Sequence, residues 1–460
     1  MGDATTAVLD AIGDDADAAL HGRDLIRATG LSSGALYPTL ARLQRTGLVE
    51  AHWQDGRRTY RRLPAGPGRG PAPHAAAGKT AERAPHAAAG KTAEQAPHAV
   101  AGKTAEQAPL AWWLPAIFVA AVTAHGALTR PAAIRLSDLG VYVGAVGGLR
   151  HGTSLYDFIS TGNAPFTYPP FAGLLFWPLT WVPTLPLQIG WTLATIAAAS
   201  WIAHVVTPRQ MAVPMLGLAL MISAPVSSDI RYGQVSVFLA AMVAVDVLRP
   251  SRWQGVLIGL AAAIKLTPLI FIPMLWFAGR RTAAATAAGT FAAAGVLAAI
   301  VLPGDSWRFW TVEVSHVSRL GYITSVGNQS LNGALMRFEV AAPFRSAAVL
   351  IVGGAVAALA LRRAARFGRA GDWFSALVVA GAASIVLSPV SWTHHQVWLV
   401  LAALLPVRLP AWARRAWTIA VLAIMLLPVT ALGPPLCGNA RLLTAIVIAA
   451  ALPLTSERAR

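Results

Sequence analysis

The sequence predicts an all-α polytopic membrane protein with about twelve transmembrane helices and a small N-terminal α+β domain. The chain is 55% hydrophobic and 12% charged, with a mean hydropathy of +0.55, whereas a soluble domain usually carries about 25% charged residues. The charge deficit is uneven. Residues 1–110 are polar and hold most of the acids, while residues 111–455 are a succession of apolar segments.

The first segment, residues 1–64, is expected to be a small soluble domain. Leu36, Leu40 and Leu43 have helical spacing, and Gly47 then ends the helix. A shorter helix precedes them, and "LVEAHW", a "QDGR" turn and "RTYRRL" predict a hairpin. Helix, turn, helix and hairpin is a winged helix-turn-helix order. Arginines on the second helix and the wing would face phosphates: Arg42, Arg45, Arg57, Arg58, Arg61 and Arg62.

Residues 18–63 resemble PadR-type transcriptional regulators. The matching pieces are Leu20-His21-Gly22, "GLSSGALYPTLARLQRTGLVE" and "DGRRTYRRL". The resemblance implies DNA binding, and a two-fold DNA site would need two such heads. That family usually dimerises through further helices, whereas here a low-complexity sequence follows. A protein-interaction module or a vestigial domain therefore stays open as an alternative.

Residues 65–110 are expected to be a linker. A 12-residue repeat places prolines at Pro73, Pro85, Pro97 and Pro109. The repeat is rich in Ala and Pro and poor in large apolar residues, so it cannot build a core.

Residues 111–455 form the multi-span domain. Its apolar segments of about 15–24 residues suit a hydrocarbon core roughly 30 Å thick. The expected spans lie near 111–129, 166–183, 187–206, 211–225, 234–248, 255–278, 283–302, 346–362, 373–389, 396–407, 416–432 and 441–455.

Arginines predict the orientation of these spans. Arg280-Arg281, the cluster from Arg362 to Arg369, and Arg408 with Arg414-Arg415 fall on the side assigned to the cytoplasm. The N-terminus is expected there as well, in a multi-pass protein of the plasma membrane without a cleavable signal peptide. "RPSR" (249–252) falls on the outer side, so either earlier spans are drawn wrongly or one is re-entrant. The loops 130–165 and 303–345 and the junction 388–396 lie outside.

Ionisable residues inside or beside a span indicate function. Short polar motifs, which we call the polar stations, follow one another in order along this domain. Together they resemble the motifs of the polyprenyl-phosphate-mannose-dependent α-1,2-mannosyltransferases of actinobacteria, enzymes with the GT-C fold. The residues that carry the resemblance are Asp138 with Tyr142, Gly152 with Tyr156-Asp157, "YPP" (168–170), Gly233-Gln234, "KLTP" (265–268), "NQS" (328–330), and Ser388-Pro389 with Trp392 and His394-His395.

The resemblance implies a hexosyltransferase, mannose being the expected sugar. The partners would be a polyprenyl-phosphate sugar, a glycolipid or glycan acceptor, and membrane lipid, with possible DNA binding through residues 1–64. No cofactor and no obligatory metal are expected, because no Asp-x-Asp signature of nucleotide-sugar enzymes stands out. Transfer to an alcohol needs a base and a group that holds the leaving phosphate. Asp138 is the expected general base, and Lys265 and His394 are the expected catalytic partners. The expected substrate-binding residues are Tyr142, Asp157, Tyr168, Arg231, Gln234, Asn328, Gln329 and His395.

Simpler interpretations compete with these roles. Asp138 could be an ordinary loop acid or cap a helix with Ser137, and Asp157 could be the base instead. Lys265 could snorkel or pair within the bundle, and the His pair could be interfacial. Gln234 and Asn328 could only satisfy exposed backbone, and "YPP" could shape the entry to a span.

Two other functions remain open at this point. Polar residues near the bilayer midplane would also suit a transporter or flippase. A cytoplasmic winged helix would suit a membrane-tethered transcriptional regulator.

Overall fold

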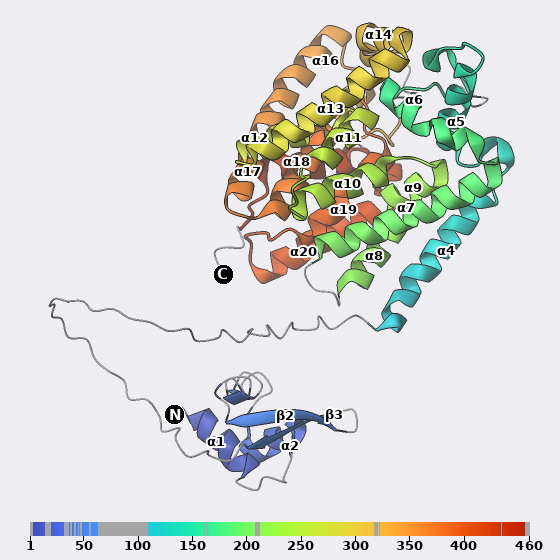
Figure 1. Cartoon of the computed structure of the whole chain (residues 1–460). Coiled ribbons are helices and arrows are strands. Elements are labelled where there is room, and N and C mark those ends of the chain that lie inside the picture. Colours follow the sequence, from blue (N-terminus) through green and yellow to red (C-terminus); the bar gives the residue numbers. More distant parts are fainter. Residues whose placement is uncertain are drawn as a thin grey trace, which may run out of the picture. The chain divides into compact units, whose positions relative to one another are not determined.

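The computed structural model describes the chain in two compact units, Met1–Ala99 and Val100–Arg460 (Figure 1). Each unit is described by itself. The described residues are 3–13, 20–31, 36, 39–40, 43–44, 46, 48–54, 57–62, 109–160, 162, 164–207, 212–316, 321, 323–433 and 435–455.

The first unit contains a three-stranded antiparallel sheet of order β1-β3-β2. Leu25, Leu36, Leu40 and Leu43 are buried in one cluster with Tyr60. The predicted hairpin is confirmed, since strands β2 and β3 pair from Val49 opposite Arg62 to Gln54 opposite Arg57. The elements are α1 (Asp3–Ile12), β1 (Leu20–His21), α2 (Gly22–Thr29), β2 (Val49–Gln54) and β3 (Arg57–Arg62).

Few of the arginines expected to contact DNA can be placed in this unit. Arg42 and Arg45 lie outside the described residues, as do the side chains of Arg57 and Arg58. Arg61 forms an ion pair across the hairpin, with its Nη2 3.4 Å from Glu50 Oε1. An exposed pair of this kind contributes at most about 1 kcal/mol to stability.

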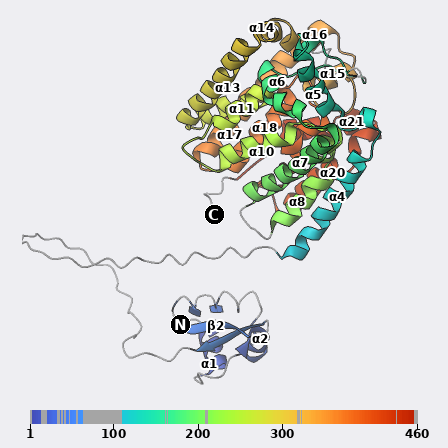
Figure 2. The same ribbon diagram turned by 45° about the vertical axis from the view of Figure 1, so that its right-hand side comes forward.

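The second unit is almost entirely helical, and its long helices identify a multi-pass membrane protein (Figures 1 and 2). Within the described residues, four helices are long and apolar enough to cross a membrane. A bent pair with a 61° angle would make a fifth. The four are Leu110–Leu128 (η1 and α4), Thr184–Val206 (α7), Arg281–Val301 (α13) and Ala342–Arg369 (α16, η9 and α17); the bent pair is α8 (Val213–Ile222) with α9 (Ala224–Tyr232).

The other expected spans are shorter helices, because prolines and polar residues interrupt the apolar runs. Residues 166–183 are not one span but α6 (Pro170–Phe176) and η4 (Trp177–Trp181), which follow the Pro169-Pro170 pair. Residues 255–278 divide at Lys265, whose backbone is extended. Apolar length alone does not reveal such breaks, so the count of about twelve spans stays a prediction.

Short elements make up much of the rest of the second unit. They are α5 (Ser137–Leu149), η3 (Leu155–Asp157), α10 (Ser236–Leu248), α11 (Val256–Ile264), η6 (Thr267–Ile270), α12 (Phe271–Phe277), α14 (Pro303–Thr311), η7 (Glu313–Ser315), α15 (Leu331–Arg337), α18 (Trp373–Leu387), η10 (Thr393–His395), α19 (Val397–Leu401), α20 (Ala411–Leu426) and α22 (Ala440–Ile446).

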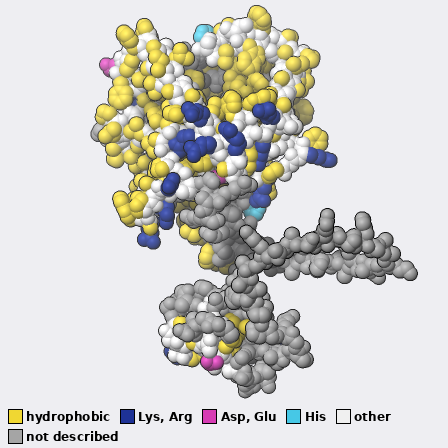
Figure 3. Space-filling view, turned by 90° about the vertical axis from the view of Figure 1, so that its left-hand side faces the viewer, with side chains coloured by type: hydrophobic (Ala, Val, Ile, Leu, Met, Phe, Trp, Pro, Cys, Tyr) yellow, Lys and Arg dark blue, Asp and Glu magenta, His cyan; other side chains and the backbone are white. Residues whose placement is uncertain are grey.

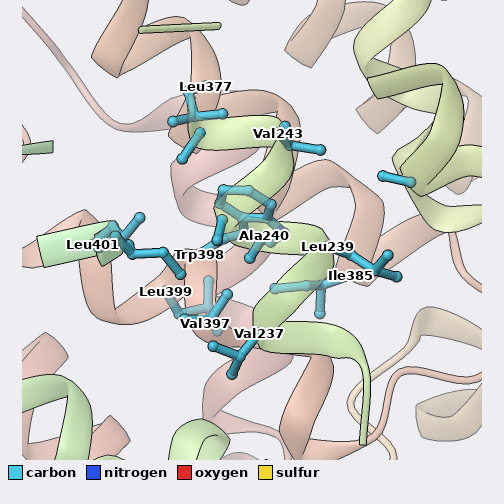
Figure 4. Packing of buried hydrophobic residues seen from close by; sticks show 14 of the residues in the cluster. Val237, Leu239, Ala240, Val243, Leu377, Ile385, Val397, Trp398, Leu399 and Leu401 are labelled. Atoms are coloured by element: carbon cyan, nitrogen blue, oxygen red, sulfur yellow. The ribbon is translucent and has the colours of Figure 1, made fainter. Parts of the chain in front are cut away.

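Helices α10 and α18 form the centre of the core. Figure 4 shows Val237 and Val243 of α10 beside Leu377 and Ile385 of α18, with Trp398 of α19 between them. Both helices are buried on nearly all sides, which explains why their sequences are apolar without a polar stripe.

One end of the second unit is rich in arginine, and Figure 3 shows Lys and Arg side chains gathered on part of one face. Arg280 Nη1 donates to Val247 O at 2.7 Å, and its guanidinium lies 3.4 Å from the centre of the Trp373 ring. The turns before α11, α13 and α18 therefore meet at this end, which we call the arginine end. "RPSR" (249–252) precedes α11, so its predicted placement on the opposite side was wrong. The break at Lys265 accounts for that error, because α11 runs from the arginine end to the polar end and η6 with α12 return to Arg280.

The other ends of the same helices carry the polar stations. Helix α10 begins just after Gln234, α11 ends just before Lys265, and α18 ends just before Ser388. The arginine end and this polar end are therefore opposite ends of one bundle.

Candidate functional site

A cavity of about 580 Å³ opens at the polar end of the second unit. Its volume lies in the range of roughly 300–1,000 Å³ that is typical of small-molecule sites. It is lined by segments far apart in the sequence, which include Asp138, Tyr168, Gln234, Lys265, Glu313 and His394. The predicted polar stations thus converge on one space.

Asp138 lies in the first turn of α5 and faces the cavity. The N-cap of α5 is Leu136, and no side chain caps this helix, so the interpretation of Asp138 as a cap is wrong. Leu136 is fully buried with a left-handed backbone (φ 44°), a conformation that costs energy for a residue other than glycine.

Among the described residues, the hydrogen bonds to the Asp138 carboxylate come from side chains. Oδ2 accepts from Gln234 Nε2, and Oδ1 accepts from Ser137 Oγ at 3.2 Å. Burial raises the pKa of Asp138 above its ordinary value, although the hydrogen bonds from Gln234 and Ser137 and the charge of Lys265 act to lower it. A carboxylate with a raised pKa is a stronger base than an exposed one, which suits proton abstraction.

Gln234 joins Asp138 to two tyrosines. Its Oε1 accepts from Tyr142 OH at 3.0 Å and from Tyr168 OH at 2.9 Å, and the two hydroxyls lie 2.8 Å apart. Burial raises the pKa of both phenols, so they act as neutral donors. The amide oxygen is thereby fixed toward the tyrosines, and the amide nitrogen is fixed toward Asp138.

Lys265 forms the cationic side of the cavity. Its Nζ lies 2.8 Å from His395 Nε2 and 3.5 Å from Tyr168 OH. Burial lowers the pKa of His394 and His395, and the charge of Lys265 lowers both further, so both imidazoles are neutral. A neutral His395 Nε2 can accept a proton of the Lys265 ammonium. These contacts show pairing within the bundle and no snorkelling.

His394 is also buried and lines the cavity. Its ring packs edge-on against His395, with the ring centres 4.6 Å apart. Its Nε2 has no hydrogen-bond partner among the described residues. A buried position of this kind argues against the interfacial interpretation of the pair.

Four predicted substrate-binding residues do not line this cavity. Arg231 is exposed on α9, 5.8 Å from the Tyr232 ring. Asp157 has a side chain 54% exposed and is ion-paired with Arg308 at 2.6 Å. Both are therefore poorly placed for the roles expected of them, and Asp157 is a weak rival to Asp138 as the base.

The amides of Asn328 and Gln329 are occupied by backbone groups. Asn328 Oδ1 accepts from Ser330 N and Ser391 N, and its Nδ2 donates to Ile323 O. Gln329 bonds to Val326 O, Gly438 O and Leu442 N. These contacts favour the alternative left open for Asn328, in which the amide satisfies the backbone.

Two acids near the site were missed. Asp229 is fully buried at the end of α9, and its Oδ2 accepts from Val237 N at 3.1 Å at the start of α10. Glu313 lies on the cavity wall. Asp229 could have been found, because it precedes Gln234 in the same polar run, whereas nothing in the sequence around Glu313 distinguishes it. Among the described residues, no three His, Cys, Asp or Glu side chains could hold a metal ion.

The second unit is similar in sequence to known glycosyltransferases. The family model of glycosyltransferase family 87 matches residues 166–389. The polyprenol-phosphate-mannose-dependent alpha-(1-2)-phosphatidylinositol mannoside mannosyltransferase of Mycobacterium tuberculosis is 36% identical over 287 residues, which cover 57% of this chain and 66% of that protein. No solved structure matches the chain.

A second relative is covered more fully. The polyprenol-phosphate-mannose-dependent alpha-(1-2)-phosphatidylinositol pentamannoside mannosyltransferase of Mycolicibacterium smegmatis is 35% identical over 332 residues, which cover 66% of this chain and 80% of that protein. The family match falls within the second unit, where the cavity lies. The chain therefore belongs to glycosyltransferase family 87 and is a multi-pass membrane glycosyltransferase.

Proposed function

We propose that the chain transfers mannose from a polyprenyl-phosphate mannose to a hydroxyl of a phosphatidylinositol mannoside glycolipid, with α-1,2 linkage. The names of the relatives support the donor and the acceptor. The observation that carries the proposal is the cavity in which Asp138 and Lys265 share one hydrogen-bonded network.

In this proposal Asp138 is the general base. Its carboxylate takes the proton of the acceptor hydroxyl as that oxygen attacks the anomeric carbon of the donor sugar. The bond from that carbon to the phosphate oxygen breaks, and polyprenyl phosphate leaves with the bonding electron pair. Gln234 keeps the carboxylate oriented through the reaction, because its own amide is held by two tyrosines.

Lys265 holds the leaving phosphate. Its ammonium supplies a positive charge in a space largely shielded from water, where electrostatic stabilisation is strong. The neutral His395 orients that ammonium, and His394 Nε2 is available to a phosphate oxygen if its nitrogen carries the proton.

The arrangement of the bundle supports catalysis on the outer face. Arginine-rich loops usually remain in the cytoplasm, and the cavity lies at the end opposite to these arginines. We therefore place the cavity outside and the N-terminus in the cytoplasm.

The test is transfer from a polyprenyl-phosphate mannose to a phosphatidylinositol mannoside, using the full chain in detergent. Wild-type protein should form product although no gradient exists, which a transporter would not do. Asp138→Asn should abolish product formation, while Asp157→Asn should stay within about tenfold of wild type, since Asp157 lies outside the cavity. Full activity of Asp138→Asn would remove Asp138 as the base.

For the first unit we propose a winged helix that binds DNA. The supporting observation is the hairpin, whose strand β3 carries Arg57, Arg58, Arg61 and Arg62 beside a buried leucine cluster. A mobility-shift assay on residues 1–64 should show binding that weakens steeply as salt increases. Absence of a shift at low salt would leave the interaction or vestigial interpretation.

A further inference from the structure

The wall of the cavity that carries Glu313 differs in charge from the wall that carries Lys265. Lys265 and the two histidines bring a cation and neutral donors to one side. Glu313, in the short turn η7, brings a carboxylate to another part of the lining. The Glu313 side chain is only 6% exposed, so a ligand in the cavity would meet a largely desolvated charge.

Arg308 fixes the position of Glu313. Its Nε donates to Glu313 Oε1 at 2.8 Å, and its Nη1 donates to Asp157 Oδ1 at 2.6 Å. Arg308 thus ties η7 to the first outer loop. The carboxylate of Glu313 is held rigidly at the end of helix α14, as a binding group must be to select among ligands.

A chain of contacts joins this wall to the network around Asp138. Phe309, one residue after Arg308, stacks on Tyr156 with ring centres 5.8 Å apart. Tyr156 OH donates to Tyr168 O at 2.9 Å, and Tyr168 contacts Gln234. The Glu313 wall and the catalytic network therefore share one rigid frame.

From this geometry we infer that Glu313 binds the acceptor, by accepting hydrogen bonds from hydroxyl groups of its sugar or inositol ring. The inference rests on the proposed function. A fixed carboxylate repels the phosphate of the donor, which belongs beside Lys265. Hydroxyl groups are donors, and their bonds to a carboxylate are strengthened by its charge. Glu313 would thus select the polyhydroxylated acceptor and turn its reactive hydroxyl toward Asp138.

The test separates the two substrates kinetically. With saturating donor, Glu313→Gln should raise the KM for acceptor about tenfold, since a bond to a charged group is lost. The KM for donor should not change. Glu339→Gln is the matched control, because Glu339 is an exposed acid of the same outer loop and does not line the cavity.

Direct binding provides the second measurement. In the Asp138→Asn background, where turnover is removed, Glu313→Gln should weaken acceptor binding by about the same factor. The protein should stay folded in detergent, with its melting midpoint lowered by the loss of the Arg308 ion pair. An increased KM for donor would assign Glu313 to the donor and overturn the inference, as would an unchanged KM for acceptor. If wild-type protein forms no product, the proposed function fails, whereas active wild type with unaffected Glu313→Gln rejects this inference alone.

Discussion

Two carboxylates stand at opposite ends of the second unit, one buried and one half-buried, and they are held in different ways. Asp246, at the arginine end, is 4% exposed and accepts from backbone amides: Gly255 N at 2.9 and 3.0 Å, and Ile258 N at 2.9 Å. Asp138, at the polar end, accepts within the described part of the chain from the side chains of Ser137 and Gln234 and faces the cavity.

The difference indicates what each carboxylate is for. Asp246 satisfies the free amides at the start of α11, where Gly255 has a φ of 105° and packs so closely that a Cβ would lie 2.1 Å from Ala283 O. A carboxylate whose oxygens accept hydrogen bonds from backbone amides stabilises the fold. A carboxylate oriented by side chains and left open to a cavity is available for chemistry.

The largest expected effect is on catalysis at the polar end. Asp138→Asn should lower kcat about 10³-fold, because a general base contributes roughly 10²–10⁴-fold. Its melting midpoint in detergent should be unchanged or higher, since one half-buried charge is removed. Product formation and thermal aggregation, measured on one preparation, check the expected kcat and melting midpoint. Strong destabilisation of Asp138→Asn would show that Asp138, like Asp246, mainly stabilises the fold.

Lys265→Met should have the next largest effect. Loss of the ammonium should lower kcat/KM for donor about 10²-fold, as for other groups that stabilise a developing anion. Lys265→Arg should recover part of that loss, since it restores the charge without the geometry. Initial rates at varied donor concentration provide the measurement, and equal activity of the Met and Arg variants would exclude a role for the charge.

Asp246→Asn should act on stability instead. The amide would present donor hydrogens to backbone N–H groups, which should cost about 1–3 kcal/mol of the free energy of unfolding. The activity of each folded molecule should be retained. Thermal aggregation in detergent, with activity normalised to folded protein, checks this outcome. A loss of specific activity without lower stability would contradict the distinction between the two acids.

The smallest expected effect is a shift in pH dependence. The hydrogen bond from Gln234 lowers the pKa of Asp138, so Gln234→Leu should raise that pKa further. The base must be ionised, and the acid limb of kcat/KM should therefore move to higher pH, by about one unit for a bond of roughly 1.4 kcal/mol. Tyr142→Phe leaves the Gln234–Asp138 bond in place and should shift the limb less. An acid limb that does not move in Gln234→Leu would separate Gln234 from the base.

Several residues singled out in the sequence line one cavity in the structure. Asp138, Tyr168, Gln234 and Lys265 could be found, because polar residues in apolar surroundings are conspicuous. The same reasoning selected Asn328 too, since a residue that satisfies backbone looks identical in sequence to one that binds substrate. Whether such a side chain faces the backbone or the cavity depends on tertiary packing.

The boundaries of individual spans were harder to predict for a related reason. Apolar length records hydrophobicity but not the breaks at Pro169 and Lys265, which turn long runs into short helices. Glu313 was missed because its significance comes only from Arg308 and the cavity, both of which depend on the folded chain.

The unequal lengths of the helices have a further consequence. Helix α13 has 21 residues and rises about 32 Å, whereas α10 and α18, with 13 and 15 residues, rise about 20 and 22 Å. Each has one end at the arginine end, where α13 and α18 begin and α10 finishes. The cavity floor is therefore recessed about 10 Å toward the bilayer relative to the far end of α13. Lipid-anchored substrates can then reach the cavity by diffusing within the membrane plane. The turnover rate should follow their surface density, and adding detergent at constant bulk substrate should dilute that surface and slow the reaction.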